Sequence, residues 1–348
     1  IMFYSGENNL ITDVDGILVG NAEDKEIGTG TTILIPPVGS TAAADVRGGA
    51  PGTREVGALN PYNLVDTIDA VVLSGGSAWG LEAASSAANY IGKSGRGFKT
   101  SENIKNVPMI PAAILFDLNN GGNKDWGDEP PYNNLGIEAS TRASEKFQLG
   151  NVGAGYGAKA GSLKGGLGSA SFENKEGLKI GGLFAVNSFG SVVNYETGQF
   201  WGASDELNNE FGGMGAPQNL PEDILSGSSI GHALEKSNTT FGIVATNARL
   251  DAKTAKRIAI MSHTGMARAI RPIHTAVDGD VIFVVSTNTF EKELNYREIN
   301  EIGELGARVC SRSISRAIYE ADKLYEMQSW RDKSVSYTHL TLPTSDLV

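Results

Sequence analysis

The sequence predicts an α/β sandwich, in which β-sheets are stacked between layers of helices. Strand-like and helix-like segments alternate, but two or more strands often follow one another before the next helix, unlike a doubly wound parallel sheet. The chain has 348 residues, enough for one large domain with a sizeable core. Glycine accounts for 44 of them, against a usual share of about 7%. We therefore expect many tight turns and close backbone approaches.

The first half of the chain combines β-branched runs with loops and two helical patterns. The predicted strands are Leu10 to Gly20, Gly30 to Pro36, Asp69 to Leu73 and Ile110 to Phe116. The predicted helices are Leu81 to Ile91 and Ile137 to Phe147. Glycines and prolines make Ala42 to Arg54 a shaped loop, and Leu118 to Asn134 is a polar loop.

The second half opens with a glycine cluster, Gly150 to Gly168, and a long polar insertion, Gly202 to Ser229, interrupts it. The predicted strands are Leu183 to Val186, Gly190 to Val193, Thr240 to Thr246 and Asp280 to Ser286. The predicted helices are Ala252 to Ile270 and Tyr296 to Met327. We expect one domain over residues 1–332, and we interpret residues 333–348 as a non-native or disordered tail, because they continue neither period nor charge pattern.

Charge and composition exclude several classes of function. The chain carries 29 basic and 40 acidic residues, a net charge of −11, and lacks a basic block, so we expect no nucleic-acid partner. Its longest apolar stretches are far shorter than the roughly 18 residues of a membrane span. No signal peptide is recognisable after Ile1, and we expect a cytoplasmic protein without a membrane partner. The single cysteine, Cys310, lies in a helical pattern and is interpreted as a buried thiol.

Two glycine motifs suggest nucleotide binding but lack the required context. The run Gly155-Tyr-Gly157-Ala-Lys-Ala160 matches G-x-G-x-x-G/A, yet no clear strand precedes it and no acidic residue ends a following strand. Gly92-Lys93-Ser94 resembles the end of a P-loop, but Ala87 stands where its first glycine should be. We expect neither a nucleotide nor any other cofactor.

The histidines favour neither a metal site nor a serine triad. His232, His263 and His274 are too scattered for a local chelate, and His339 lies in the tail, so we expect no metal. We interpret His263 as a capping or core residue of its helix. Composition leaves a Ser-His-Asp triad open, but the sequence has no G-x-S-x-G elbow.

A threonine and two aspartates offer chemistry that needs no histidine. Thr239 stands where a polar segment meets a strand, and a threonine freed as a chain terminus supplies both a hydroxyl nucleophile and an amine base. A β-branched residue opening a strand is the simpler interpretation. Asp278 and Asp280 lie two residues apart as a strand begins, so both can project to one side. They could orient a hydroxyl and an ammonium, or belong to a solvated turn.

Six motifs in this order resemble the DmpA-type L-aminopeptidase/D-esterase family of self-cleaving hydrolases, which includes β-peptidyl aminopeptidases and endo-type 6-aminohexanoate-oligomer hydrolases. The motifs are Asp45-Val-Arg-Gly-Gly-Ala-Pro-Gly-Thr-Arg54, Leu73-Ser-Gly-Gly-Ser-Ala-Trp-Gly-Leu-Glu-Ala83, Gly150-Asn-Val-Gly-Ala-Gly155, Lys164-Gly-Gly-Leu-Gly-Ser-Ala-Ser171, Asn238-Thr-Thr240 and Arg271 to Asp280. The resemblance spans nearly everything from Leu10 to about Tyr325.

This resemblance implies a four-layer αββα sandwich like that of N-terminal-nucleophile hydrolases. It also implies self-cleavage between Asn238 and Thr239, giving chains of residues 1–238 and 239–332. The catalytic residues that it implies are the nucleophile Thr239, the oxyanion-stabilising Asn187, the lysine Lys164 with Lys159 as a rival, and the pair Asp278 and Asp280. Trp79 matches an aromatic position beside the substrate cleft of some relatives. We expect a peptide or amide substrate and a homo-oligomer of processed heterodimers.

The resemblance leaves the substrate open. Many aminopeptidase members use serine as nucleophile with a downstream Ser-x-Glu pair, whereas Thr239 with Asp278-x-Asp280 resembles the nylon-oligomer hydrolases. An acyltransferase of the ornithine acetyltransferase type, with a related fold and a threonine nucleophile, is one alternative. An inactive binding relative is another.

Overall fold

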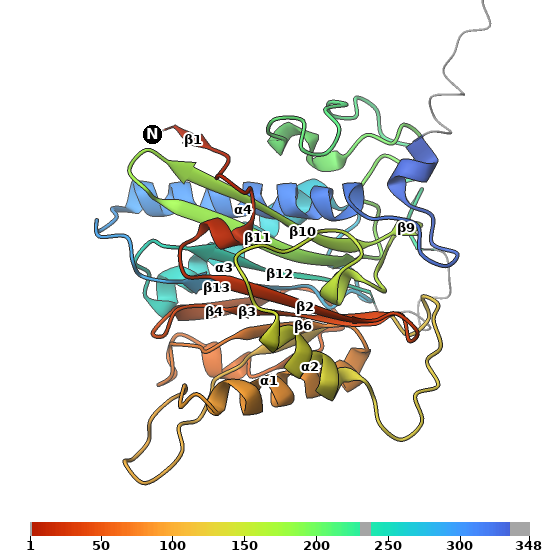
Figure 1. The fold of residues 1–348 in the computed structure, drawn as a ribbon. Coiled ribbons are helices and arrows are strands. Elements are labelled where there is room, and N and C mark those ends of the chain that lie inside the picture. Colours follow the sequence, from red (N-terminus) through yellow and green to blue (C-terminus); the bar gives the residue numbers. More distant parts are fainter. Residues whose placement is uncertain (1, 230–237, 335–348) are drawn as a thin grey trace, which may run out of the picture.

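Two β-sheets lie face to face between two pairs of helices, so that the chain forms four layers (Figure 1). The computed structural model describes residues 2–229 and 238–334. Helices α3 and α4 cover the outer face of one sheet, and α1 and α2 cover the outer face of the other. This arrangement confirms the expected αββα sandwich.

The larger sheet has the strand order β1-β10-β11-β12-β13-β4. Its strands are β1 (Phe3–Tyr4), β10 (Gly166–Asn174), β11 (Lys179–Asn187), β12 (Thr239–Thr246), β13 (Val281–Ser286) and β4 (Thr41–Val46). All neighbours are antiparallel except β12 and β13, which run parallel, with Phe241 opposite Val281. The parallel pair brings the starts of β12 and β13 to the same edge of the sheet.

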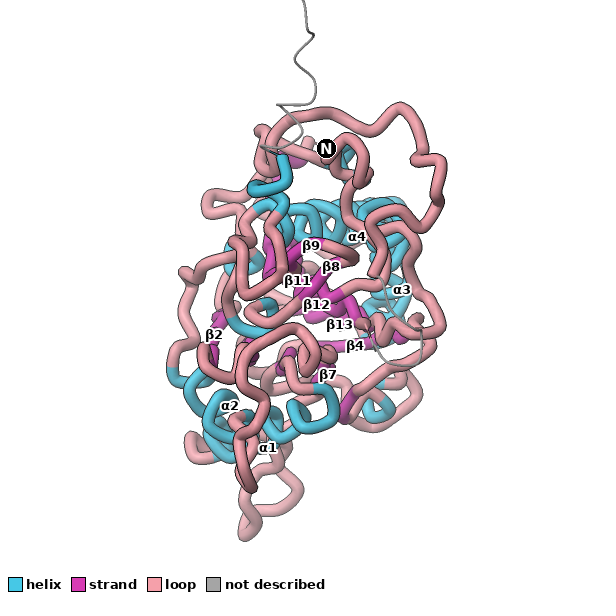
Figure 2. The backbone as a smooth tube through the Cα atoms, turned by 90° about the vertical axis from the view of Figure 1, so that its right-hand side faces the viewer, coloured by secondary structure: helices cyan, strands magenta, loops and turns pink. Residues whose placement is uncertain are grey.

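The second sheet has the order β2-β3-β6-β7-β5, and a short hairpin, β8-β9, stands apart. Their strands are β2 (Leu18–Asp24), β3 (Thr29–Ile35), β6 (Val71–Ser74), β7 (Ala112–Ile114), β5 (Thr53–Arg54), β8 (Lys159–Ala160) and β9 (Leu163–Lys164). Figure 2 looks onto the end of the molecule at which β8 and β9 lie near β11 and β12. The proposed catalytic residues gather at this end.

The helices are α1 (Glu82–Gly92), α2 (Tyr132–Thr141), α3 (Ala252–Ala269) and α4 (Tyr296–Tyr319). The short 3-10 helices are η1 (Ile11–Asp13), η2 (Gly57–Leu59), η3 (Ser77–Leu81), η4 (Gly153–Gly155) and η5 (Trp201–Asp205). Helix α3 begins where the Asp251 side chain accepts a hydrogen bond from the Thr254 N–H. Asn295 and Glu298 form a capping box at the start of α4. In both cases a side chain satisfies a backbone donor of the first helical turn.

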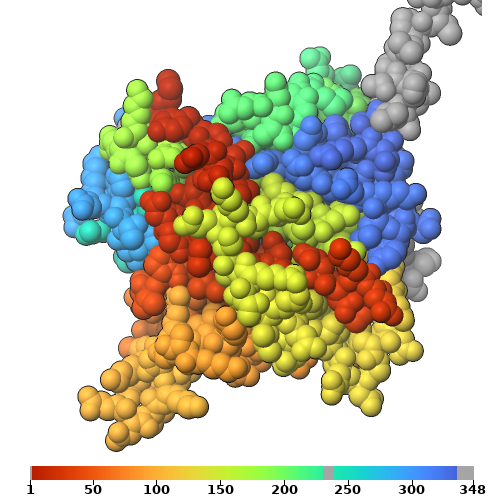
Figure 3. Space-filling model, in the orientation of Figure 1, coloured from red at the N-terminus to blue at the C-terminus, as the bar shows by residue number. Residues whose placement is uncertain are grey.

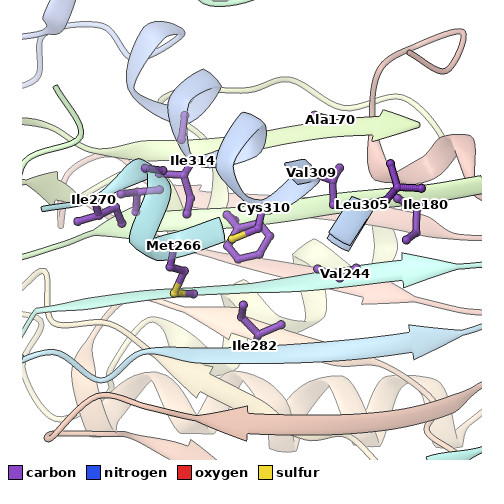
Figure 4. Packing of buried hydrophobic residues seen from close by; sticks show 14 of the residues in the cluster. Ala170, Ile180, Val244, Met266, Ile270, Ile282, Leu305, Val309, Cys310 and Ile314 are labelled. Carbon is purple, nitrogen blue, oxygen red and sulfur yellow. The ribbon is translucent and has the colours of Figure 1, made fainter. Parts of the chain in front are cut away.

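Three apolar clusters separate the four layers: one under α3 and α4, one between the sheets, and one over α1 and α2. In the first cluster, Met266 of α3 and Ile314 of α4 pack over Val244 and Ile282 of the sheet (Figure 4). Cys310 is fully buried in the same cluster, and burial raises the pKa of its thiol. The predicted buried thiol is confirmed.

Glycines allow α4 to lie directly on the sheet. A Cβ on Gly168 would stand 1.9 Å from the carbonyl oxygen of Ser313, and one on Gly166 would stand 2.4 Å from that of Ala317. Since both carbonyls belong to α4, only glycine fits at these two positions of β10. The glycine cluster from Gly150 to Gly168 therefore ends in a strand.

Several other element predictions were wrong at their boundaries. The predicted loop from Ala42 begins with β4, and the helix predicted over Ile137–Phe147 begins after Pro131 and ends at Thr141. The predicted strand from Gly190 to Val193 forms only isolated bridges, through Ser191 and Val193. The last helix ends at Tyr319 rather than Met327. Proline is common at a helix start, so Pro131 was an available signal, whereas short irregular pairings are weak signals in a single sequence.

One segment projects from the rest of the molecule. The chain between α1 and β7, light orange at the lower left of Figure 3, is closed by mutual backbone hydrogen bonds between Phe98 and Val107. Of the predicted tail, Lys333 and Ser334 belong to a helical turn, and residues 335–348 lie outside the described residues. Within residues 2–229 and 238–334, no helix is both long and apolar enough to cross a membrane.

Candidate active site

Thr239 is the first residue of β12 and lies directly opposite Asn187, the last residue of β11. Side chains at opposite positions of an antiparallel pair share one face of the sheet. Thr239 is 3% exposed and Asn187 is 1% exposed. The Thr239 hydroxyl donates to the carbonyl oxygen of Asn238 at 2.6 Å, so the proposed nucleophile contacts the peptide bond that it would cut.

Asp280 holds the residue that follows the nucleophile. Its Oδ1 accepts the Thr240 N–H at 2.8 Å. Its Oδ2 accepts the His274 N–H at 3.0 Å and lies 2.8 Å from His274 Nδ1. Asp280 is fully buried, so its charge acts where water does not screen it.

Asp278 lies beside Asn238, with which it forms a parallel bridge. Its Oδ1 accepts the Phe189 N–H at 3.1 Å, and its Oδ2 accepts the hydroxyl and N–H of Thr275. Burial, together with the nearby Asp280 carboxylate, raises the pKa of Asp278 to about 6. The two predicted aspartates therefore flank the proposed cleavage site, one holding Thr240 and the other bridging to Asn238.

Asn187 has its amide fixed by three partners. Its Oδ1 accepts the Lys159 N–H at 2.8 Å and the Asn120 Nδ2–H at 3.2 Å, while its Nδ2 donates to the Phe116 carbonyl at 3.1 Å. The two donors that meet Oδ1 set the orientation of the amide. Because an amide nitrogen carries two protons, the second one can serve an oxyanion.

The two candidate lysines face each other across the β8-β9 hairpin. Lys164 is fully buried, and its ammonium donates to the carbonyls of Gly155 at 2.9 Å and Gly165 at 2.7 Å. Burial lowers the pKa of Lys164 to about 7. Lys159 is only half-buried, and its backbone contacts Asn187. Lys159 therefore contacts the proposed site through its backbone N–H, which binds Asn187. Lys164 makes no such contact with Asn187 and adjoins the site because it pairs with Lys159 across the hairpin.

Asp117 anchors the loop behind Asn187. Its carboxylate accepts the Thr29 hydroxyl at 2.6 Å and the Gly76 N–H at 2.9 Å. Burial raises its pKa, and the positive charge of Lys124 opposes this effect. These hydrogen bonds of Asp117 hold the start of the segment from Phe116 to Asn120 in place, and this segment in turn binds the Asn187 amide.

Trp79 lies outside this set of contacts. It belongs to η3, is 56% exposed, and packs edge-on against Trp126 with ring centroids 6.0 Å apart. Trp126 lines a cavity of about 680 Å³ whose other walls are rich in carboxylates. The acidic residues of this cavity are Asp24, Glu26, Glu82, Asp125, Asp128 and Glu129.

Sequence reasoning missed Asn120, Phe116, Thr275 and the contact between His274 and Asp280. Asn120 is one of many polar residues in a loop, and nothing local marks it out. His274 lies in the same motif as the aspartates, and that proximity was the available signal. His263 instead contacts the carbonyl of Asp45 at 2.9 Å, and burial lowers its pKa to about 4. Its interpretation as a core histidine is confirmed by its burial.

Histidines and acids do not gather into a metal site in the described part of the chain. No group of three or more His, Cys, Asp or Glu residues within residues 2–229 and 238–334 is arranged to hold a metal ion. His232 lies outside the described residues.

Comparison with known proteins identifies the family of the chain. Residues 9–330 match the family model "Peptidase family S58". An uncharacterized aminopeptidase of Mycobacterium bovis is 36% identical over 347 residues, covering 93% of this chain and 97% of that protein. A 6-aminohexanoate-oligomer endohydrolase of Kocuria sp. is 27% identical over 294 residues, covering 82% of this chain and 77% of that protein.

Solved structures agree at the level of the fold. The L-aminopeptidase D-Ala-esterase/amidase of Ochrobactrum anthropi, described as a variant of the Ntn hydrolase fold, superposes with a TM-score of 0.67 at 18% identity. The superposition covers 94% of this chain and 91% of that one. The four layers are therefore those of the Ntn hydrolase fold. The resemblance inferred from the six motifs is confirmed, and the chain belongs to peptidase family S58, a family of peptide and amide hydrolases.

Proposed function

We propose that this chain cuts itself between Asn238 and Thr239 and that Thr239, as the new chain terminus, is the nucleophile of an amide hydrolase. The observation that carries the proposal is the 2.6 Å hydrogen bond from the Thr239 hydroxyl to the Asn238 carbonyl, opposite Asn187. A hydroxyl held against its own preceding carbonyl needs little motion to attack the carbon of that group.

In the processed enzyme, the free amine of Thr239 takes the hydroxyl proton as Oγ attacks the substrate carbonyl. The amine of a chain terminus has an ordinary pKa of about 7.7 to 8, so it is a competent base near neutral pH. Asn187 stabilises the tetrahedral oxyanion through its second Nδ2 proton. Asp278 and Asp280 hold the backbone around the nucleophile and balance the charge of its ammonium.

The lysine of the site is Lys159 or Lys164. Lys159 contacts Asn187 only through its backbone N–H, a contact that does not depend on its side chain, and the ammonium of Lys164 is occupied by two backbone carbonyls. The lowered pKa of Lys164 is the observation in favour of the second lysine, since a lysine of pKa about 7 exchanges protons at working pH.

We propose that the substrate is a small peptide or linear amide with a free amino group. The carboxylates around Trp126 favour a cationic group. This cavity is lined by the outer part of the loop whose Asn120 contacts Asn187. The names of relatives, an aminopeptidase and an oligomer endohydrolase, fit the same class.

A denaturing gel and terminal sequencing test the proposal. From a mass of 36.6 kDa over 348 residues, self-cleavage should give fragments of about 25 and 12 kDa, because intramolecular attack needs no other enzyme. Thr239→Ala should leave one band. A small fragment that begins at any residue other than Thr239 contradicts the assignment.

Substrate assays then separate hydrolase from transferase. Amino-acyl nitroanilides and linear aminohexanoate oligomers, each with a free and an acetylated amino end, should be hydrolysed faster in the free form. If product forms mainly on an added amine acceptor and scarcely on water, the acyltransferase alternative holds instead.

A further inference from the structure

The proposed cleavage site is part of the β-ladder between the segments that lead into β12 and β13. Asn238 donates its N–H to the Val277 carbonyl at 2.9 Å, and Gly279 donates its N–H to the Asn238 carbonyl at 2.7 Å. The Asn238 carbonyl oxygen therefore accepts two short hydrogen bonds, from the Gly279 N–H and from the Thr239 hydroxyl. One donor belongs to the nucleophile, and the other is a backbone group that takes no part in bond making.

A loop on the opposite side holds the peptide groups around Gly279. Arg47 donates its N–H to the Asp280 carbonyl at 2.9 Å, and Ala50 donates to the Asp278 carbonyl at 2.9 Å. Gly49 donates to the Thr275 carbonyl at 3.1 Å. With the carbonyls on both sides of Gly279 fixed from outside, its N–H stays directed at Asn238.

Glycine is required on both surfaces of this contact. A Cβ on Gly48 would stand 2.1 Å from the Asp278 carbonyl oxygen, so a larger residue would push the loop away. A Cβ on Gly279 would stand 2.7 Å from Thr239 Oγ1 and 2.6 Å from the Ala50 carbonyl oxygen. The irregular loop that follows β4 thus holds the backbone of residues 278–280 in place through its hydrogen bonds.

We propose that the Gly279 N–H is the oxyanion donor of self-cleavage, held in place by the loop from Arg47 to Ala50. The proposal rests on the proposed function and adds the group that stabilises the first intermediate. It separates two oxyanion sites: the Gly279 N–H serves the carbonyl of Asn238 during maturation, and Asn187 serves the carbonyl of the substrate afterwards.

The step balances as follows. Thr239 Oγ forms a bond to the Asn238 carbonyl carbon, and the carbonyl electrons move to oxygen, where the Gly279 N–H meets the negative charge. Collapse of this intermediate breaks the bond between the carbon and the Thr239 nitrogen, which receives the proton lost by the hydroxyl. Water then hydrolyses the ester, leaving a carboxylate on Asn238 and restoring the hydroxyl and a free amine on Thr239.

Replacing the N–H by an oxygen atom tests the donor directly. Glycolic acid in place of Gly279, introduced by cell-free translation of the full chain, gives a backbone ester without that N–H. The matched control is the hydroxy-acid counterpart of Val285, which removes an N–H from β13 between its neighbours β12 and β4. We expect the Gly279 ester to self-cleave about 10²- to 10³-fold more slowly than the control, the usual effect of losing one oxyanion donor.

The dependence of self-cleavage on pH should keep its shape in the Gly279 ester, since no titrating group is altered. Equal cleavage rates of the two esters, at matching far-ultraviolet circular dichroism, overturn the proposal. If the unmodified chain does not cleave before Thr239, the proposed function itself fails and this inference fails with it. Cleavage of the unmodified chain together with an unaffected Gly279 ester overturns the inference alone.

If the ester variant does not fold, a conventional amino-acid substitution tests whether the Gly279 N–H is the oxyanion donor. Gly279→Ala displaces the donor or the hydroxyl, whereas Gly57→Ala adds a methyl group at a position with nothing within 4 Å. We expect self-cleavage at least tenfold slower in Gly279→Ala than in Gly57→Ala. Equal rates in the two folded variants again overturn the proposal.

Discussion

The imidazole of His274 lies against the carboxylate of Asp280, with Nδ1 2.8 Å from Oδ2. The backbone N–H of His274 donates to the same oxygen, and the other carboxylate oxygen accepts the N–H of Thr240. His274 therefore connects, through one buried carboxylate, to the backbone that carries the proposed nucleophile. It is a positioning residue, because the proposed chemistry uses the amine of Thr239 as its base.

Substituting His274 should slow catalysis without abolishing it. In His274→Ala, Asp280 keeps both backbone donors, so we expect kcat of the processed enzyme to fall about tenfold with KM nearly unchanged. His263→Ala should lower the melting temperature but retain turnover, since His263 binds the carbonyl of Asp45. Steady-state kinetics on a nitroanilide substrate make the comparison. A folded, self-cleaved His274→Ala chain with no chemical step would favour a histidine-dependent triad.

Residues next to regular strands were the predictable part of the site. Thr239, Asp278 and Asp280 each adjoin a β-branched run, and β12 pairs with β13 so that the starts of both strands meet. Asn187 was identified only through the family resemblance. Its proposed role depends on its position opposite Thr239 on the neighbouring strand, and this pairing is not visible in the sequence. Self-cleavage, the site roles and the homo-oligomer stay predictions.

The fold class followed from the order of strands and helices, but individual elements depended on tertiary contacts. Gly166 and Gly168 belong to β10 because α4 lies on them, and no local propensity favours a strand there. Asn120 could not be identified, since its loop has no periodicity and its amide matters only where it meets Asn187. The loop after Val46 looked irregular for the same reason: its hydrogen bonds go to a segment more than 200 residues away.

The two lysines should differ in how they affect stability with pH. The folded-state pKa of Lys164, about 7, is below its ordinary value of 10.5, so between these values the unfolded chain binds a proton that the folded chain lacks. Stability should therefore rise with pH across this window, by up to about 1.4 kcal/mol per pH unit. Lys164→Met should remove the rise and Lys159→Met should preserve it, as measured by urea unfolding. The same rise in Lys164→Met would contradict this account.

The activity of the same two variants identifies the lysine of the site. If Lys159 is that residue, Lys159→Met should lose self-cleavage or hydrolysis at every pH while folding normally. Normal turnover in Lys159→Met, together with loss of self-cleavage or hydrolysis in folded Lys164→Met, would show that Lys164 is the lysine of the site.

Asp278 should have the opposite effect on stability. Its folded-state pKa, about 6, lies above the ordinary 3.8, so the folded chain holds a proton that the unfolded chain releases between these values. The uncut chain should therefore lose stability as pH rises from about 4 to 6, by up to about 1.4 kcal/mol per pH unit. Uncut Thr239→Ala is the background for this test, and adding Asp278→Asn should flatten the curve. An unchanged slope in the double variant would show that another group titrates.

Asn120 should support catalysis by orienting Asn187. Its Nδ2 donates to Asn187 Oδ1 at 3.2 Å and to the Gly157 carbonyl at 2.9 Å, so Asn120→Ala leaves the amide of Asn187 with one donor fewer on its oxygen. Because the Lys159 N–H and the Phe116 carbonyl still hold that amide, we expect kcat to fall about tenfold with little change in KM. Asn187→Ala removes the oxyanion donor itself and should cost about 10²- to 10³-fold.

A control asparagine outside the candidate site separates orientation from general disturbance. Asn103 is exposed in the segment between α1 and β7, so Asn103→Ala should keep the turnover of the unaltered enzyme. In the double variant Asn120→Ala with Asn187→Ala, the loss should equal that of Asn187→Ala alone, since Asn120 has then no amide to orient. Additive losses in this cycle would mean that Asn120 acts on the reaction by a route other than Asn187.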